Sequence, residues 1–392
     1  LTHRNFTAMT EAVTAMHVVT SDDSLLLFLP LAHNFARLMQ YTAVREGVTL
    51  AYCRDFIGVP KALDALRPTV LPGVPRFYER VASQVRGEID AAGGVRGAAA
   101  RWSLAVGRRA AAQRDRGSQP GPLLRAKLAA ADRLVFKRAR SRLGGELRLG
   151  VSGGAALPQH VAELFDAIGI VLLEGYGLSE ATCASHFNRP NRRRVGTVGL
   201  PLPGIGARLD VDGEILISGD TVFAGYLGDA AATASVMTGD GWLRTGDVGE
   251  LDDDGFLRII DRKKDLIVTS GGKNVAPQKL ENALSAEPLV SQALVIGDGR
   301  PYLVALIAPD LAEVRRLGAT RDQVEQRIDT AVKRLNREVG KAERIARHMV
   351  LDREFSQEDG EVTATLKLRR RTCAGRFAAE IDQLYKDRLS SA

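Results

Sequence analysis

The sequence predicts an α/β fold. We expect a large N-terminal α/β domain with a small antiparallel β unit, followed by a small, mobile α+β C-terminal domain. Short apolar runs alternate with helical stretches early in the chain, which favours a largely parallel sheet. Between 207 and 260 the pattern changes to short strands separated by Gly and Asp turns. The length of 392 residues also exceeds one typical core.

Composition indicates a globular protein without a membrane-spanning helix. Hydrophobic residues make up 45% and charged residues 26%, which is ordinary for soluble domains. No uncharged apolar run reaches 18 residues, and no signal peptide is evident. The three cysteines, Cys53, Cys183 and Cys373, lack metal-ligand spacing, so we expect a reduced, cytoplasmic setting. The net charge of +7 suits anionic partners.

The first strands of the expected sheet lie near the N-terminus. Residues 24–32, SLLLFLPLA, predict a buried strand that ends in a loop at Pro30. Residues 48–57 predict a second strand. A third strand is expected ahead of the proline-rich run 68–75.

Residues 86–142 predict helices with a break near 117–122. This stretch has 14 Lys or Arg residues against 4 Asp or Glu residues and is rich in Ala. One interpretation is a solvated helical face. The other is a basic patch that contacts acidic lipid or ligand phosphates.

Two strands that run into glycine turns follow. Residues 147–157, LRLGVSGGAAL, predict a strand and a Gly-rich turn, and residues 170–180, IVLLEGYGLSE, repeat that design. The twisted antiparallel β unit is then expected over 207–260.

The C-terminal part begins with a charged and then Gly-rich segment, residues 261–273, as expected of a hinge. Beyond it, 277–310 predicts a helix and then strands, and 321–340 predicts a polar helix. The predicted domains are therefore 1–260, a hinge at 261–265, and 266–392.

Two glycine turns carry candidate binding chemistry. In the turn at 152–156, glycines let the backbone approach a flat ligand closely, at the strand end where α/β sheets bind ligands; a structural turn is the alternative. In the segment 174–180, Tyr176 could stack on a base, Ser179 could donate to a phosphate, and Glu180 could hold Mg²⁺. A loop with a packed Tyr and an exposed Glu is the alternative there.

Three later residues are candidates for ribose and phosphate chemistry. Asp247, in DGWLRTGD, could accept two hydrogen bonds from a ribose diol, or be a plain turn residue. Arg262, in DRKKD, could clamp ribose or phosphate, or belong to a solvated charge run. Lys367 could neutralise charge that develops during attack on phosphorus, or lie in a basic strand.

The order of these signals resembles that of the adenylate-forming superfamily of AMP-binding enzymes. This group includes acyl-CoA synthetases, luciferases and peptide-synthetase adenylation domains. Residues 240–265 resemble the fatty-acyl-CoA synthetase signature, and 29–37, 275–281 and the LKLRR that begins at Leu366 resemble long-chain members. The resemblance is to bacterial long-chain fatty acid–CoA ligases, and the Ala and Arg bias is actinobacterial-like.

The resemblance implies roles for the residues of the two glycine turns. Gly154, Glu174, Gly175 and Tyr176 are expected to line the adenine pocket. Ser179 is expected to touch the α-phosphate of ATP.

The resemblance also implies catalytic and interdomain roles. Glu180 is expected to hold Mg²⁺ and Asp247 to bind the ribose hydroxyls, with Arg262 helping from the interdomain edge. Lys264 is expected at the pivot of the hinge, and Lys367 is expected to be the adenylation lysine.

Two further pairs complete the implied site. Gly271 and Gly272 lie where relatives pass the pantetheine arm of coenzyme A. His33 and Phe35 fall where relatives shape the acyl pocket.

The implied function is that of a long-chain fatty acid–CoA ligase, which uses ATP to form acyl-adenylate and then acyl-CoA. Fatty acid, ATP, Mg²⁺ and coenzyme A are the expected ligands, with no nucleic acid. A fatty acyl-AMP ligase, another adenylating enzyme with a different acceptor, and a non-catalytic binding module are the alternatives. Residues 86–142 would supply any peripheral contact with acidic membrane.

One departure from the family pattern concerns the phosphate loop. Relatives carry a Ser/Thr/Gly-rich loop ending in Lys, whose backbone amides hold the β- and γ-phosphates, just before a segment like Leu1–Asn5. The sequence starts after that loop. The chain as written is therefore expected to have a partial N-terminal domain and to be inactive alone.

Overall fold

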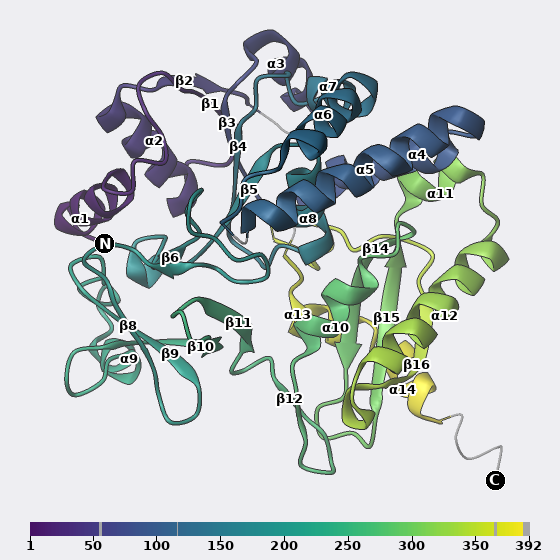
Figure 1. Ribbon diagram of the computed structural model, residues 1–392. Helices are drawn as coiled ribbons and strands as arrows, with labels where there is room; N and C mark the ends of the chain where they lie inside the picture. Colours follow the sequence, from purple (N-terminus) through teal and green to yellow (C-terminus); the bar gives the residue numbers. More distant parts are fainter. Residues whose placement is uncertain (55–56, 116, 364–366, 387–392) are drawn as a thin grey trace. The chain divides into compact units, whose positions relative to one another are not determined.

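The computed structural model describes residues 1–54, 57–115, 117–363 and 367–386 (Figure 1). The chain divides into two compact units. Unit 1 comprises Leu1–Thr245 and Gly249–Ile259, and unit 2 comprises Gly246–Val248 and Ile260–Ala392. The segment 261–265 lies wholly within unit 2, and its motion as a hinge remains a prediction.

Unit 1 is built on a seven-stranded sheet. Its strands are β1 (Ser24–Leu27), β2 (Thr49–Tyr52), β3 (Val70–Gly73), β4 (Leu149–Ser152), β5 (Val171–Tyr176), β6 (His186–Phe187) and β7 (Leu200–Pro201). The order is β2-β1-β3-β4-β5-β6-β7. The five strands from β2 to β5 are parallel, while β6 and β7 are antiparallel. This confirms the predicted α/β fold.

The third strand was predicted in the wrong place. The stretch ahead of the proline-rich run forms helix α3 (Val59–Leu66), and β3 lies inside the run, with Pro72 in register with Val151. Val70 and Leu71 are fully buried. Burying each such side chain contributes about 1.5–3 kcal/mol, which outweighs the roughly 0.5–1.5 kcal/mol of one ladder hydrogen bond.

Helices cover the sheet. Helix α2 (Asn34–Glu46) packs on β1, β2 and α1 (His3–Thr14), and α8 (Gln159–Ala167) packs on β5. Helix α4 (Pro75–Ala91) buries Tyr78, whose hydroxyl donates to the Leu71 carbonyl at 2.5 Å.

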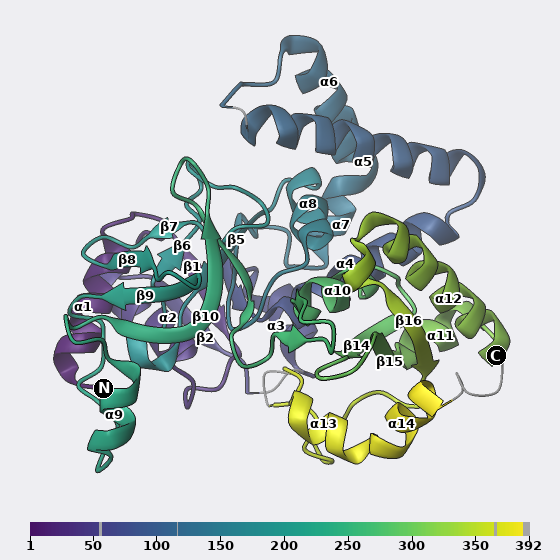
Figure 2. The ribbon, with the colours of Figure 1, turned by 90° about the horizontal axis from the view of Figure 1, so that it is seen from below.

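The basic stretch is helical, as predicted. After α4 come α5 (Gly94–Asp115), α6 (Pro122–Ala131), the π-helix η1 (Asp132–Phe136) and α7 (Lys137–Ser141), so the predicted break at 117–122 is confirmed. Figure 2 shows α5 and α6 side by side within unit 1. Small residues let α5 approach α8 closely, since a Cβ on Gly107 would lie 2.2 Å from the Ala167 carbonyl oxygen.

The small β unit is a four-stranded sheet in the order β11-β10-β9-β8. Its strands are β8 (Gly206–Leu209), β9 (Glu214–Ser218), β10 (Leu243–Leu251) and β11 (Leu257–Arg262), and helix α9 (Ala230–Val236) lies in the β9–β10 connection. Strands β8 and β9 are antiparallel, as the Gly and Asp turns predicted.

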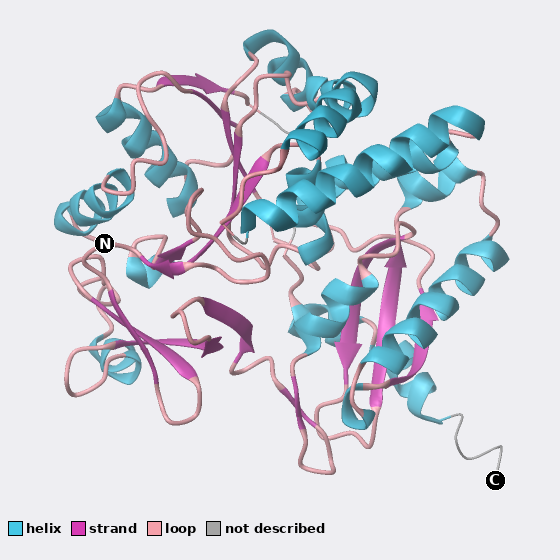
Figure 3. Cartoon of the chain, in the orientation of Figure 1, coloured by secondary structure: helices cyan, strands magenta, loops and turns pink. Residues whose placement is uncertain are grey.

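Unit 2 is an α+β fold on the three-stranded sheet β14-β15-β16 (Figure 3). Its elements are β12 (Ile267–Val268), β13 (Asn274–Val275), α10 (Pro277–Leu284), β14 (Val290–Ile296), β15 (Leu303–Pro309), α11 (Leu311–Leu317), α12 (Arg321–Glu338), η3 (Lys341–Glu343), β16 (Ile345–Val350), α13 (Arg370–Arg376) and α14 (Ala378–Lys386). Alternate residues of β15 face opposite cores. Ala305 packs with α10 and α12, and Leu306 packs with α13 and α14. Among the described residues, no helix combines the length and apolarity needed to cross a membrane.

Candidate functional site

The first predicted turn follows β4. Gly154 has φ of +87°, a conformation that favours glycine. A Cβ on Gly153 would lie 3.6 Å from the Phe35 ring, so the structure brings the buried Phe35 against this turn. His33 is exposed and forms the N-cap of α2, where its Nδ1 accepts from the Phe35 N–H at 3.3 Å. Its role in an acyl pocket remains a prediction.

Glu174 is buried on β5 and supports the same turn. Its Oε1 accepts from the Leu157 N–H at 2.9 Å, and its backbone is in register with Ser152 of β4. Burial raises the pKa of Glu174 to about 8, against the opposing effect of the Leu157 N–H. The Glu174 side chain is therefore a protonated group that holds the Gly-rich turn in place near neutral pH.

The segment after Glu174 depends on close backbone approach. A Cβ on Gly175 would lie 2.8 Å from the Phe187 ring, and a Cβ on Gly177 would lie 2.0 Å from the Cys183 carbonyl oxygen. Tyr176, between them, is half-buried, and its ring centroid lies 6.1 Å from that of the buried His186. The two glycines are therefore required by space.

Glu180 has a partner that sequence reasoning missed. Ser179 and Glu180 begin the 3₁₀ turn η2 (Ser179–Ala181), with Ser179 exposed. The Tyr226 hydroxyl donates to Glu180 Oε1 at 2.8 Å. Tyr226 is itself placed by its N–H, which donates to Thr233 Oγ1 at 2.9 Å. The hydroxyl thus orients the carboxylate predicted to bind Mg²⁺.

In unit 2 the structure brings Asp247, Arg262 and Lys367 into one electrostatic environment. Asp247 is buried, and Arg262 Nε lies 3.4 Å from its Oδ1. Burial and the nearby Arg262 lower the pKa of Lys367, while the carboxylates of Asp247, Asp265 and Asp261 oppose that shift. Lys367 is thus influenced by charges of both signs from the DRKKD segment and β10, and burial together with Arg262 outweighs the carboxylates.

The predicted pivot and coenzyme A glycines lie on exposed turns of unit 2. Lys264 is exposed in the turn that the Asp265 N–H closes on the Arg262 carbonyl at 2.9 Å. Gly271 and Gly272 form the turn between β12 and β13, with φ of +69° at Gly272. Their roles remain predictions.

A hollow in unit 1 includes one predicted site residue, Glu174. Its lining is Leu157, Ala162, Leu172, Glu174, Asn188, Arg193, Arg194, Val195, Gly196 and Thr197. Gly154, Gly175 and Tyr176 are not among these residues. No motif predicted the arginine side of this hollow, where Arg193 Nη1 lies 2.5 Å from Oδ1 of the buried Asp166.

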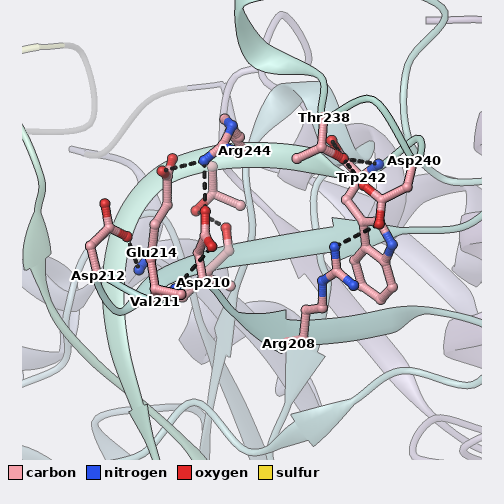
Figure 4. Close-up of polar contacts among 11 residues, drawn as sticks. Arg208, Asp210, Val211, Asp212, Glu214, Thr238, Asp240, Trp242 and Arg244 are labelled. Carbon is pink, nitrogen blue, oxygen red and sulfur yellow. Dashed lines mark hydrogen bonds and ion pairs between the residues drawn. The ribbon is translucent and has the colours of Figure 1, made fainter.

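An acidic cluster at the β8–β9 turn is separate from Glu180 in sequence. Asp210, Asp212 and Glu214 have carboxylate oxygens within 4.8 Å of one another. Arg244 neutralises part of this charge, because its Nη1 lies 2.8 Å from Asp210 Oδ2 and 3.3 Å from Glu214 Oε2 (Figure 4). We therefore interpret the cluster as an ion-pair network of the small β sheet.

The predicted site residues thus fall into two sets. Unit 1 holds His33, Phe35, Gly154, Glu174, Gly175, Tyr176, Ser179 and Glu180, and unit 2 holds Asp247, Arg262, Lys264, Gly271, Gly272 and Lys367. Within unit 1, Phe35 and Glu174 both contact the turn after β4. That the two sets share one AMP pocket remains a prediction.

Comparison with known proteins identifies the family. The model of the AMP-binding enzyme family matches residues 1–227, and that of the AMP-binding enzyme C-terminal domain matches residues 264–389. The chain belongs to the AMP-binding enzyme family. These matches also confirm the resemblance to the superfamily that the order of motifs indicated.

Relatives within the AMP-binding family include fatty acid–CoA ligases. The long-chain-fatty-acid–CoA ligase FadD15 of Mycobacterium bovis is 40% identical over 410 residues, which cover 98% of this chain and 66% of FadD15. The human long-chain-fatty-acid–CoA ligase 1 is 31% identical over 420 residues, covering 98% of this chain and 58% of that protein. The chain therefore spans between 58% and 66% of the length of these two relatives.

A solved structure shows the same fold. The A-PCP didomain of carboxylic acid reductase from Segniliparus rugosus, in complex with AMP, superposes with a TM-score of 0.74 at 23% identity, over 99% of this chain and 51% of that one. This similarity shows that the two chains share a fold.

Proposed function

We propose that the protein is a long-chain fatty acid–CoA ligase. The observation that carries the proposal is the 40% identity with a long-chain-fatty-acid–CoA ligase across 98% of the chain, a match that spans both units. The arrangement of the motifs supports it: a glycine-shaped loop with Tyr176 and Glu180 in unit 1, and a lysine among carboxylates in unit 2.

The proposed reaction has two steps. A fatty acid carboxylate oxygen attacks the α-phosphorus of ATP, and the bond to the bridging oxygen breaks to release pyrophosphate. The coenzyme A thiol then loses its proton and attacks the acyl carbon, releasing AMP and leaving the thioester. Lys367 balances the charge that develops on the attacking and bridging oxygens in the first step, which is differential stabilisation of the transition state.

The residues around Glu180 fit a magnesium ion bound with the nucleotide. Mg²⁺ is held by one or two carboxylates together with phosphates and water, and the Tyr226 hydroxyl occupies one lone pair of Glu180 Oε1, which leaves Oε2 for a metal. When bound there, the ion would neutralise phosphate charge. Ser179 is exposed beside Glu180, and in this proposal its hydroxyl donates to a phosphate oxygen.

Pyrophosphate exchange tests the function. With the full-length gene product, ATP and a ladder of fatty acids, we expect exchange that depends on long-chain acid, and acyl-CoA when coenzyme A is added. Adenylate that accumulates and never becomes thioester would instead indicate an acyl-AMP ligase or another acceptor. Nucleotide binding without exchange would indicate a binding module.

We further propose that helices α5 and α6 contact an anionic membrane surface. Arg101, Arg108 and Arg109 are exposed on α5, and within the described residues none of them makes an ion pair. Trp102 and Leu123 are exposed nearby, at 40% and 70%. Cationic and apolar side chains together suit a lipid headgroup layer, where each Arg contributes about 1 kcal/mol.

Vesicle flotation tests this contact. We expect the protein to float with vesicles that contain phosphatidylserine and not to float with neutral vesicles. The triple variant R101E/R108E/R109E should not float with either kind. Equal flotation of the triple variant, or equal binding to neutral vesicles, would refute the contact.

A further inference from the structure

A closed ring of polar contacts ties the start of α13 to the edge of the unit 2 sheet. Arg370, the first residue of α13, has its Nη1 2.5 Å from Oε1 of Glu281 on α10, and its Nη2 donates to the Val295 carbonyl of β14 at 2.6 Å. Glu281 Oε1 also accepts from the Val295 N–H at 2.7 Å. The two side chains thus satisfy both polar backbone groups of one residue.

The position of Val295 explains why this ring is needed. Strand β14 is an edge of the three-stranded sheet, so its outward N–H and C=O groups need partners other than a strand. The side chains of Arg370 and Glu281 are only 20% and 12% exposed. Burial alone would lower the pKa of Arg370, but the adjacent Glu281 carboxylate more than offsets it and the pKa is raised, so the arginine stays cationic.

Lys367 lies three residues before Arg370, where residues 367–369 pair with residues 361–363 through an antiparallel bridge between Val362 and Leu368. The Thr363 N–H donates to the Lys367 carbonyl at 2.9 Å, the Lys367 N–H donates to Thr363 Oγ1 at 3.1 Å, and the Arg369 N–H donates to the Glu361 carbonyl at 2.8 Å. Because these bonds join residues 367–369 to residues 361–363, we expect a displacement at Arg370 to move the Lys367 backbone with it.

Helix α10 links this ring to the other charged residues of the site. Asp261 accepts from the Arg262 N–H at 2.7 Å and from the Gln278 N–H, in the first turn of α10, at 2.9 Å. The same helix carries Glu281 one turn later. Helix α10 therefore contacts Asp261, next to Arg262, through the Gln278 N–H and contacts Arg370 through Glu281, one turn later.

We propose that Arg370 is a positioning residue that fixes Lys367 relative to the Asp247–Arg262 pair. The inference deepens the proposed function and rests on it for the reaction that Lys367 serves. The structural part rests on the hydrogen bonds alone. A catalytic group misplaced by about 1 Å can lower a rate by about 10²-fold, so loss of the ring is expected to slow adenylation selectively.

The kinetic test compares the two half-reactions in the full-length gene product. In R370M, acyl-adenylate formation should fall about 10- to 100-fold, while thioester formation from supplied acyl-adenylate should stay within about threefold of wild type. R370K should be intermediate, because Lys keeps the charge but not the planar fork. The matched control is R327M, which removes another Arg–Glu pair of unit 2, 2.7 Å from Glu287, and should change neither step.

A double variant separates positioning from general support. K367A/R370M should form acyl-adenylate no more slowly than K367A, because Arg370 acts through Lys367. A further loss in the double variant, or an equal slowing of both half-reactions in R370M, would overturn the inference.

Hydrogen exchange tests the same point without turnover. In R370M the amides of Lys367 and Arg369 should exchange at least about tenfold faster than in R327M, with the β15 amides unchanged. Unchanged exchange at the Lys367 amide in R370M refutes the inference. If the β15 amides also lose protection in R370M, the same amides are compared in R370K. Faster exchange confined to Lys367 and Arg369 then supports the inference, and unchanged exchange at Lys367 refutes it. A wild type that forms no acyl-adenylate would refute the proposed function, while the exchange result would still decide the role of Arg370.

Discussion

The loop after β5 in unit 1 and the surroundings of Lys367 in unit 2 are held by different forces. At the end of β5 and in the loop after it, Gly175 and Gly177 allow contacts that any Cβ would block, and the buried Glu174 of β5 is a neutral hydrogen-bond acceptor near pH 7. The shape of this region comes from backbone approach and desolvated groups.

Around Lys367 the organising force is charge. Arg262 pairs with Asp247, Arg370 pairs with Glu281, and Lys367 is influenced by both signs. We therefore expect the two regions to be sensitive to different kinds of substitution. Added volume should damage the unit 1 loop, and removed charge should damage the unit 2 cluster.

The largest expected effect is the removal of charge at Lys367. In Lys367→Ala we expect acyl-adenylate formation to fall by about 10²–10³-fold, as for other well-placed electrostatic groups, while thioester formation from supplied acyl-adenylate is spared. Rapid-quench measurement of each half-reaction checks this. Lys279→Ala, which removes an exposed lysine of unit 2 paired with Glu343, should leave both rates intact, and equal loss of both steps in Lys367→Ala would contradict the assignment.

The next effect tests added volume in unit 1. In Gly177→Ala the new Cβ would lie 2.0 Å from the Cys183 carbonyl oxygen, so the backbone must shift, and we expect a loss of about 3 kcal/mol in unfolding free energy. Urea titration measures it. Gly239→Ala is the control, because a Cβ there meets nothing within 4 Å. If both variants unfold at the same urea concentration, close approach does not shape this loop.

Helices and strands could be predicted wherever the spacing of the apolar residues and the position of the turn residues indicate the same element. Strands β4 and β5 and the polar helix α12 lie where the sequence placed them. The one misplaced strand, β3, contains Pro72. Local rules failed there because burial of the neighbouring Val70 and Leu71 is a tertiary effect that no turn signal contains.

The supporting residues of the site could not be predicted, because they are distant in sequence. Tyr226 reaches Glu180 across 46 positions, and Arg370 reaches Glu281 across 89. A motif shows which residue carries a chemical group, but the partner that orients the group is set by how elements pack. Only the folded structure shows that Tyr226 contacts Glu180 and that Glu281 contacts Arg370.

The smallest of the three effects concerns the neutral side of the comparison, at Glu174. Its pKa in the fold, about 8, lies above the ordinary value of 4.5. Between these values the unfolded chain has lost the proton that the folded chain keeps, so stability falls as pH rises from about 5 to 8. Glu174→Gln retains an oxygen for the Leu157 N–H and cannot ionise. The variant should therefore have the same free energy of unfolding as wild type near pH 5.

At pH 8, the free energy of unfolding of Glu174→Gln should exceed that of wild type by about 1–2 kcal/mol. This is less than the full pKa shift would give at roughly 1.4 kcal/mol per unit. Urea unfolding at several pH values measures the difference. Glu163→Gln is the matched control, because Glu163 is exposed on α8 and should show no such trend. A constant difference across the pH range would mean that Glu174 is ionised in the fold. The region around Glu174 would then depend on charge as the Lys367 cluster does, and the contrast between the two regions would fail.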